Sequence, residues 1–132
     1  MENSEKSALG LDANIVAGLC YVANLVCYLG IVLAIITLVT DKVNKLARFH
    51  AAQSLLLFAT SLIICLPGYF IAVALMFMNS TITSLLGGLI SLVVAVVGLG
   101  VFVFFIISAI KAFQGQIYKV PVIGNYAEKF SA

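Results

Sequence analysis

The sequence is poor in charged residues, which make up only 9% of its 132 positions, whereas 64% are hydrophobic. Soluble domains carry about 25% charged residues, because a surface in contact with water needs them. The shortage excludes an ordinary soluble globule, a disordered chain and a nucleic-acid-binding protein. The composition therefore predicts an integral protein of the inner (cytoplasmic) membrane. We expect it to contact the lipid bilayer and not to bind nucleic acid.

Histidine and cysteine are scarce too, with one His and three Cys in the chain. Cys20 and Cys27 would lie two turns apart on one helix, too far for a disulfide, and Cys65 belongs to another apolar segment. No acidic residue or second His accompanies them, so we expect neither a metal site nor a cofactor. Catalysis by a nucleophile and base, or by a metal, needs such groups, and we expect no enzyme.

Two long stretches, residues 13–40 and 49–110, contain no Asp, Glu, Lys or Arg. A helix crossing about 30 Å of hydrocarbon needs about 20 apolar residues, so the first stretch fits one crossing. The second is too long for one crossing and must turn back at its polar cluster, residues 79–84. The sequence therefore predicts an all-α membrane protein with three transmembrane helices and a short amphipathic C-terminal surface segment.

The predicted organisation is a single membrane domain over residues 1–132. Pro67-Gly68 lies inside the second predicted span, where we expect a kink, because neighbouring helices re-satisfy the freed backbone groups. The alternative is a break into two half-helices that line a path. The predicted segments are a polar tail (1–13), spans at 14–40, 51–78 and 84–113, a basic interfacial loop (41–50), a polar turn (79–83) and an interfacial tail (114–132).

The basic residues predict an orientation, because Lys and Arg accumulate on the cytoplasmic side of a membrane. The N-terminal tail has only Lys6, and the turn at residues 79–83 has none. Three of them lie at residues 42–48 and three at residues 111–129. With three spans, these two basic regions share the cytoplasmic side, and we expect the N-terminus outside.

Small and weakly polar residues recur on one face of each predicted span. Such residues let membrane helices pack closely, so we expect these faces to contact one another or a partner protein. Asn24 is the most polar of them, and we expect an interhelical hydrogen bond there; the alternative is a substrate or ion contact. The candidate packing residues are Cys20, Asn24, Cys27, Ser61, Cys65, Gly87, Ser91 and Ala95.

The segment Arg48-Phe49-His50-Ala51-Ala52-Gln53-Ser54 lies at the predicted cytoplasmic mouth of the second span. We expect Arg48 to meet lipid phosphates, and His50 and Gln53 to tie helix ends together. The alternative for His50 is proton or substrate handling, for which no carboxylate is placed nearby. The candidate interfacial residues are Arg48, His50, Gln53, Lys111, Tyr118 and Lys119.

The C-terminal tail mixes apolar, aromatic and basic residues, which is typical of a segment on the membrane surface. Pro121 and Gly124 should prevent one continuous helix. Asn125 with Glu128 has the spacing of a capping box, which predicts a short helix that opens at Tyr126.

Two blocks, residues 48–54 and 109–129, resemble a family of short prokaryotic membrane proteins of unknown function. That family is related to the Tic-twenty type chloroplast inner-envelope import component. The resemblance covers residues from about 15 to 130 and implies a helical membrane protein. The plant relative is implicated in protein passage across the inner envelope and is described with four spans, against three predicted here. The matching residues are those of 48–54, then Ala109-Ile110-Lys111-Ala112-Phe113, Gly115, Tyr118-Lys119-Val120-Pro121, Ile123-Gly124 and Ala127-Glu128-Lys129.

Two functions fit these features. The first is a non-catalytic accessory or structural subunit that packs its small-residue faces against a larger membrane complex or another copy of itself. The second is a transport or protein-translocation component, which Pro67-Gly68, Asn24 and the family resemblance favour.

Overall fold

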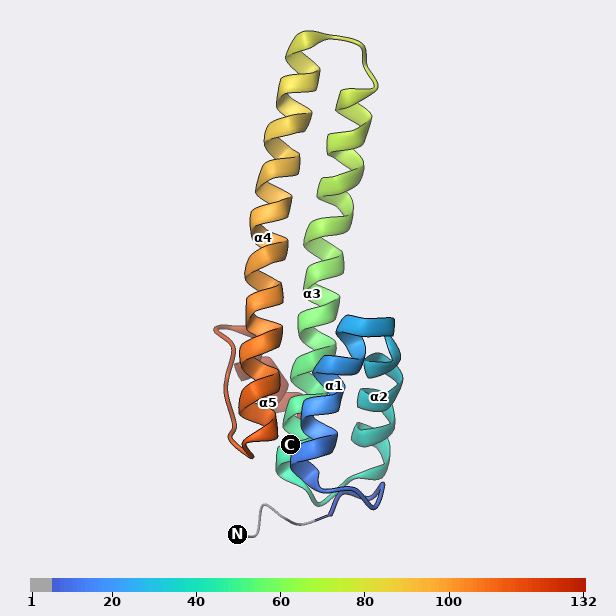
Figure 1. The fold of residues 1–132 in the computed structure, drawn as a ribbon, viewed down its shortest axis with the longest axis vertical. Coiled ribbons are helices and arrows are strands. Elements are labelled where there is room, and N and C mark those ends of the chain that lie inside the picture. Colours follow the sequence, from blue (N-terminus) through green and yellow to red (C-terminus); the bar gives the residue numbers. More distant parts are fainter. Residues whose placement is uncertain (1–5) are drawn as a thin grey trace. The chain divides into compact units, whose positions relative to one another are not determined.

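A computed structural model describes residues 6–132, except the side chain of Cys27. Contacts divide the chain into two compact units, one formed by the residues up to Leu57 together with Phe104–Ala132 (unit 1), the other by Phe58–Val103 (unit 2). Helices α3 and α4 each belong partly to both units. The helices of the described chain are α1 (Ala13–Cys27), α2 (Leu29–Thr40), α3 (Lys45–Met76), α4 (Thr81–Phe113) and α5 (Ile123–Ser131) (Figure 1).

The prediction of three transmembrane helices is wrong, because the first predicted span, residues 14–40, is two short helices. The chain is interrupted at Tyr28, whose backbone is left-handed with φ 59°. With 15 and 12 residues, α1 and α2 reach about 22 Å and about 18 Å, less than the ~30 Å of hydrocarbon. Among the described residues, two helices, α3 and α4, are long and apolar enough to cross a membrane.

Helices α1 and α2 lie side by side in unit 1 and form a helical hairpin (Figure 1). Their close approach depends on Gly30, where an added Cβ would lie 2.5 Å from the carbonyl oxygen of Cys20. Cys20, Ala34 and Ala51 are fully buried together where the hairpin meets α3. The other surface of the hairpin carries exposed side chains such as Val26 (77% exposed), which suit lipid better than water.

In unit 2, small residues let α3 and α4 pack against each other. A Cβ on Gly68 would lie 2.6 Å from Val94 Cγ2, and one on Gly87 would lie 2.7 Å from the carbonyl oxygen of Ala72. Helix α3 continues through Pro67 up to Met76. The alternative of two half-helices in the second predicted span is therefore wrong.

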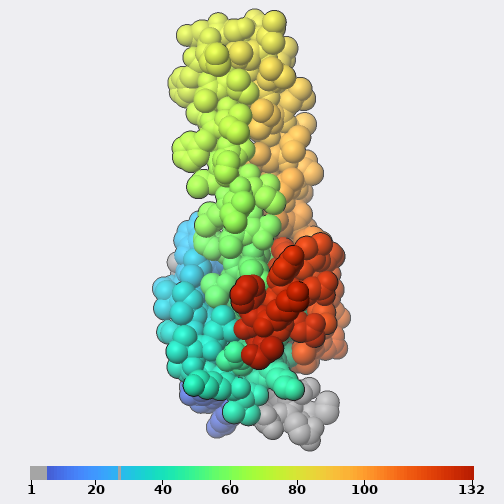
Figure 2. Space-filling model, turned by 180° about the vertical axis from the view of Figure 1, so that it is seen from behind, coloured from blue at the N-terminus to red at the C-terminus, as the bar shows by residue number. Residues whose placement is uncertain are grey.

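The predicted capping box in the tail is also wrong, because α5 begins at Ile123 rather than at Tyr126 and has no side-chain cap. Its N-cap residue, Val122, has φ 66°. Gly124 is the second residue of α5, and a side chain would not fit there, because an added Cβ would lie 2.6 Å from Lys119 Cβ. Ala127 packs with Phe49 and Ala52 of α3. Figure 2 shows α5, in red, on the surface of unit 1.

Charge is confined to one unit. All seven Lys and Arg residues of the sequence belong to unit 1, and unit 2 contains no charged residue. The N-terminal segment lies beside the end of α2, because the backbone N–H of Ala8 donates to Asp41 Oδ2 at 3.2 Å. The expected outer position of the N-terminus depended on a crossing by residues 14–40, and the structure contains no such crossing.

Candidate functional site

Four polar side chains are fully buried in unit 1 and form one cluster. Tyr21 comes from α1, His50 and Gln53 from α3, and Ser108 from α4, and each has 0% of its surface exposed. Burying polar groups costs free energy unless they are hydrogen-bonded, so their partners show what the cluster does. We call these four residues the polar cluster.

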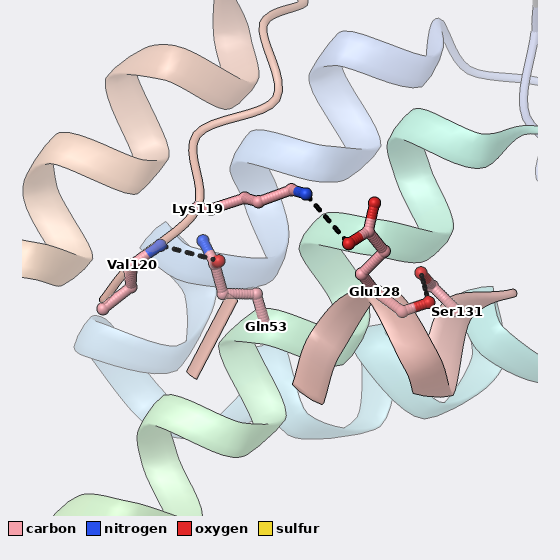
Figure 3. Close-up of polar contacts among 5 residues, drawn as sticks. All are labelled: Gln53, Lys119, Val120, Glu128 and Ser131. Atoms are coloured by element: carbon pink, nitrogen blue, oxygen red, sulfur yellow. Dashed lines mark hydrogen bonds and ion pairs between the residues drawn. The ribbon is translucent and has the colours of Figure 1, made fainter. Parts of the chain in front are cut away.

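Gln53 acts like an additional peptide unit beside the segment that connects α4 and α5. Its Nε2 donates to the carbonyl oxygen of Tyr118 at 2.9 Å, and its Oε1 accepts from the backbone N–H of Val120 at 3.1 Å. The amide therefore pairs with the donor and the acceptor of residues two apart, as a neighbouring strand would. Figure 3 shows the contact between Gln53 and Val120.

His50 fixes the same segment at a second point. Its Nε2 lies 2.9 Å from the carbonyl oxygen of Gln116, which only accepts, so Nε2 carries the proton. Nδ1 must then accept from the hydroxyl of Tyr21 at 3.0 Å, and that oxygen accepts from Gln53 Nε2 at 3.0 Å. Gln53 Nε2 also lies 3.4 Å from Ser108 Oγ. The chain of hydrogen bonds has one consistent direction and connects three helices to the 114–122 segment.

Arg48 joins the ends of two helices to α3. Its Nη1 donates to the carbonyl oxygens of Leu38 and Asp41 at 2.9 Å and 3.1 Å, at the end of α2. Its Nε donates to the carbonyl oxygen of Ser131 at 3.0 Å, at the end of α5. Carbonyls at a helix end lack intrahelical partners, and a cation there is favourable. Three of the five N–H donors of the guanidinium are thus used by the protein's own backbone.

The other interfacial candidates all lie in unit 1. Lys119 forms an ion pair with Glu128 at 2.8 Å, which connects the 114–122 segment to α5 (Figure 3). Lys111 Nζ donates to Gln116 Oε1 at 3.1 Å. Tyr118 contributes its backbone carbonyl to Gln53. The structure therefore brings these residues together around the 114–122 segment.

The candidate packing residues do not form one face. Cys20 and Asn24 are buried in unit 1 by the hairpin, and Asn24 Oδ1 has no hydrogen-bond partner among the described residues. The side chain of Cys27 lies outside the described part of the chain. The remaining five belong to unit 2. There Cys65 and Gly87 lie between α3 and α4, Ser61 donates to the carbonyl oxygen of Phe58, Ser91 is half-buried and Ala95 is exposed.

Tyr21 and Ser108 of the polar cluster were not among the candidate residues predicted from the sequence. A hydroxyl in the middle of an uncharged stretch is a usable signal, because a buried Tyr O–H needs a partner. The backbone groups that bind Gln53 and His50 cannot be identified from the sequence, because every residue has a backbone carbonyl. Among the described residues, no three His, Cys, Asp or Glu side chains lie together in a way that could hold a metal. His50 and Gln53 bind backbone groups of the 114–122 segment, and this arrangement is suited to holding the fold together.

The chain is similar to one described protein family and to two membrane proteins of an archaeon. The profile of the "Magnetosome magnetite crystal formation protein family" (MamF/MmsF) matches residues 12–127. UPF0132 membrane protein MJ1443 of Methanocaldococcus jannaschii is 33% identical over 126 residues, which cover 96% of this chain and 94% of the relative. UPF0132 membrane protein MJ1527 of the same organism is 28% identical over 123 residues, 93% of this chain and 73% of the relative. No solved structure matches the chain.

Proposed function

The chain belongs to the magnetosome magnetite crystal formation protein family, and we propose that it is a non-catalytic accessory subunit of a larger membrane complex. Its polar side chains support this role, because the buried His50 and Gln53 and the half-buried Arg48 bind the protein's own backbone. Asp41 accepts from two backbone N–H groups, and Glu128 pairs with Lys119. The proposal therefore assigns the chain a scaffolding role rather than direct contact with a mineral.

The observation that carries the proposal is a second small-residue face on α4. Gly87 points toward α3, but a Cβ on Gly88 would meet nothing within 4 Å. Ser84 and Ala95 are exposed, and a spacing of four or seven residues puts them on the same side of the helix as Gly88. The exposed Leu92 and Leu99 lie on this side too, so the small residues form notches between larger side chains. Most other exposed residues of α4 are large and apolar. A small face in lipid allows another helix to approach closely, so we assign Ser84, Gly88 and Ala95 (the outer α4 face) to the partner.

Filling this face should remove the partner without unfolding the protein. We expect a Gly88→Leu/Ala95→Leu double variant, purified in mild detergent, to lose most of its co-purifying membrane protein, because the added side chains hold the two helices apart. The matched control is Val93→Leu/Val96→Leu, which adds bulk at exposed positions on another side of α4. Equal recovery of partners with both double variants would contradict the proposal. If the recovered partner were a second copy of this chain, the protein would form a homo-oligomer and would not belong to a larger complex.

We further propose that the N-terminus and the C-terminus both lie in the cytoplasm. Helices α1 and α2 form a hairpin, so the chain returns to the side on which α1 begins, and Ala8 adjoins Asp41. With two crossings by α3 and α4, the segments that contain all seven Lys and Arg residues share one side. Basic segments are retained in the cytoplasm, which supports this orientation.

Cysteine labelling tests the orientation in intact cells. Leu9→Cys and Val43→Cys change exposed, uncharged positions and should resist a membrane-impermeant maleimide until the cells are opened. Asn79→Cys, in the connection between α3 and α4, should react from outside. The chain without an introduced cysteine gives the background. Labelling of Leu9→Cys from outside would support the N-terminus outside the cell, as first predicted from the sequence, and would contradict the hairpin topology.

The second candidate, a protein-translocation component, draws on the resemblance to the chloroplast import family. Helix α3 is continuous through Pro67, and its crossing part in unit 2 contains no charged residue, so a polar path lacks lining groups. Flux across liposomes that contain only the purified protein would favour translocation. Absence of flux together with a stable partner would favour the accessory role.

A further inference from the structure

Unit 1 contains a pocket lined by basic residues. The cavity has a volume of about 320 Å³, and Lys42, Lys45 and Arg48 line it together with Phe49 and Glu128. Lys45 is also the first residue of α3, whose N-terminus is capped by side chains, because Asn44 Oδ1 accepts from the N–H of Ala47 and Asp41 Oδ1 accepts from the N–H of Asn44. We propose that this pocket binds the phosphate headgroup of an anionic phospholipid, a role that goes beyond the accessory function.

The charges around the pocket favour an anion. Lys42 and Lys45 are exposed, and their ammonium groups have no ion pair or hydrogen bond among the described residues. The acidic side chain in the lining, Glu128, already pairs with Lys119 at 2.8 Å. The carboxylate of Asp41, next to Lys42, already accepts from the backbone N–H groups of Ala8 and Asn44. The three cations therefore outnumber the acidic groups near the pocket, and their charge attracts an anion. Basic pockets between helices on the cytoplasmic side are known to bind lipid phosphates.

Arg48 supplies directed donors. Its Nε and Nη1 atoms donate to three backbone carbonyls, which hold the guanidinium in place. Its Nη2 atom makes none of these bonds, so its two hydrogens can donate to a phosphate oxygen. A guanidinium fixed by the fold loses little conformational freedom when it binds.

An apolar groove adjoins the basic pocket and shares Arg48 with it. Its volume is about 320 Å³, and its lining includes Leu38, Leu55, Leu56 and Phe130. Phe130 lies on α5, and 66% of its surface is exposed, so its ring is available to an acyl chain in the groove. A free phosphate would leave this groove empty, whereas a phospholipid fills both volumes at once. The juxtaposition of charge and apolar surface thus selects a lipid.

Lipid binding to the full-length protein tests the proposal. In a neutral detergent, native mass spectrometry would compare phosphatidylglycerol with phosphatidylcholine as the added lipid. We expect phosphatidylglycerol to bind preferentially, and a Lys42→Gln/Lys45→Gln double variant to bind it about tenfold more weakly. The control is Lys6→Gln/Lys129→Gln, which removes the same charge at exposed positions elsewhere in unit 1 and should bind as the parent protein does. Arg48 stays unchanged because three carbonyls depend on it.

Three outcomes would overturn the proposal. Equal weakening in both double variants would show a diffuse effect of charge. Complete displacement of the lipid by inorganic phosphate would show that the pocket takes a free anion. Unchanged phosphatidylglycerol affinity in Phe130→Ser would show that the groove holds no acyl chain. The melting temperature of each variant is measured alongside, so that a loss of lipid is not confused with a loss of fold.

Discussion

Replacing Gly30 by alanine is expected to destabilise the protein by about 3 kcal/mol, with the loss concentrated in the α1–α2 hairpin. Overpacking a tight contact costs roughly 1–3 kcal/mol, and here the added Cβ meets backbone atoms of Cys20 and Asn24, which cannot rotate away. The two helices must separate, and the buried contacts of Ala34 with Cys20 and Ala51 are then lost. Thermal unfolding in detergent, followed by circular dichroism, would measure the effect.

The matched control is Gly100→Ala in α4. A Cβ on Gly100 meets nothing within 4 Å, and Ala is a better helix former than Gly, so this variant should melt at or slightly above the parent temperature. Similar melting temperatures for Gly30→Ala and Gly100→Ala would show that α1 and α2 are not packed as closely as described here.

Replacing Gln53 by leucine is expected to release the 114–122 segment. Leucine fills a similar volume but leaves the carbonyl of Tyr118 and the N–H of Val120 without their partner. A buried backbone group without a partner costs about 1–3 kcal/mol, so the two together should cost about 3 kcal/mol. Tyr21 also loses a donor at 3.0 Å. Faster amide hydrogen exchange at Gly124 and Val120 would report the release.

Gln114→Leu provides the control for this variant, because it makes the same change at an exposed position of the same segment. Its side chain is not part of the polar cluster, so exchange at Val120 should stay slow. If Gln53→Leu left exchange in residues 114–122 unchanged, the polar cluster would not be what holds this segment.

Hydropathy and charge predicted the two long helices well, because α3 and α4 fill the uncharged stretch at residues 49–110. They failed at residues 14–40, since Tyr28 and its neighbours are as apolar as a crossing helix. The reversal there depends on contact between Gly30 and the backbone of Cys20, residues that lie on different helices. Apolar composition reports which solvent a segment prefers, and it does not report where the chain turns within that solvent.

The site shows a similar division. His50 and Gln53 were identified from the sequence as residues that tie helix ends together, and the structure gives each of them backbone partners. Those partners, in residues 116–120, could not be read from the sequence, because every residue carries the same carbonyl group. The predicted contact of Arg48 with a lipid phosphate stays a prediction. The sequence did not indicate that three backbone carbonyls accept hydrogen bonds from the same guanidinium.

The uncharged unit 2 has a consequence for how the protein is made. The connection between its helices, residues 77–80, contains no charged side chain and is short. Carrying it across a bilayer requires the desolvation of few polar groups, so α3 and α4 can insert together as a pair during biosynthesis. Because residues 58–103 contain no charged side chain, they give the insertion machinery no signal for the orientation of the pair. In the orientation that we propose, the flanking lysines and arginine determine the direction of insertion, so moving them into the connection should reverse the orientation of the newly made chain.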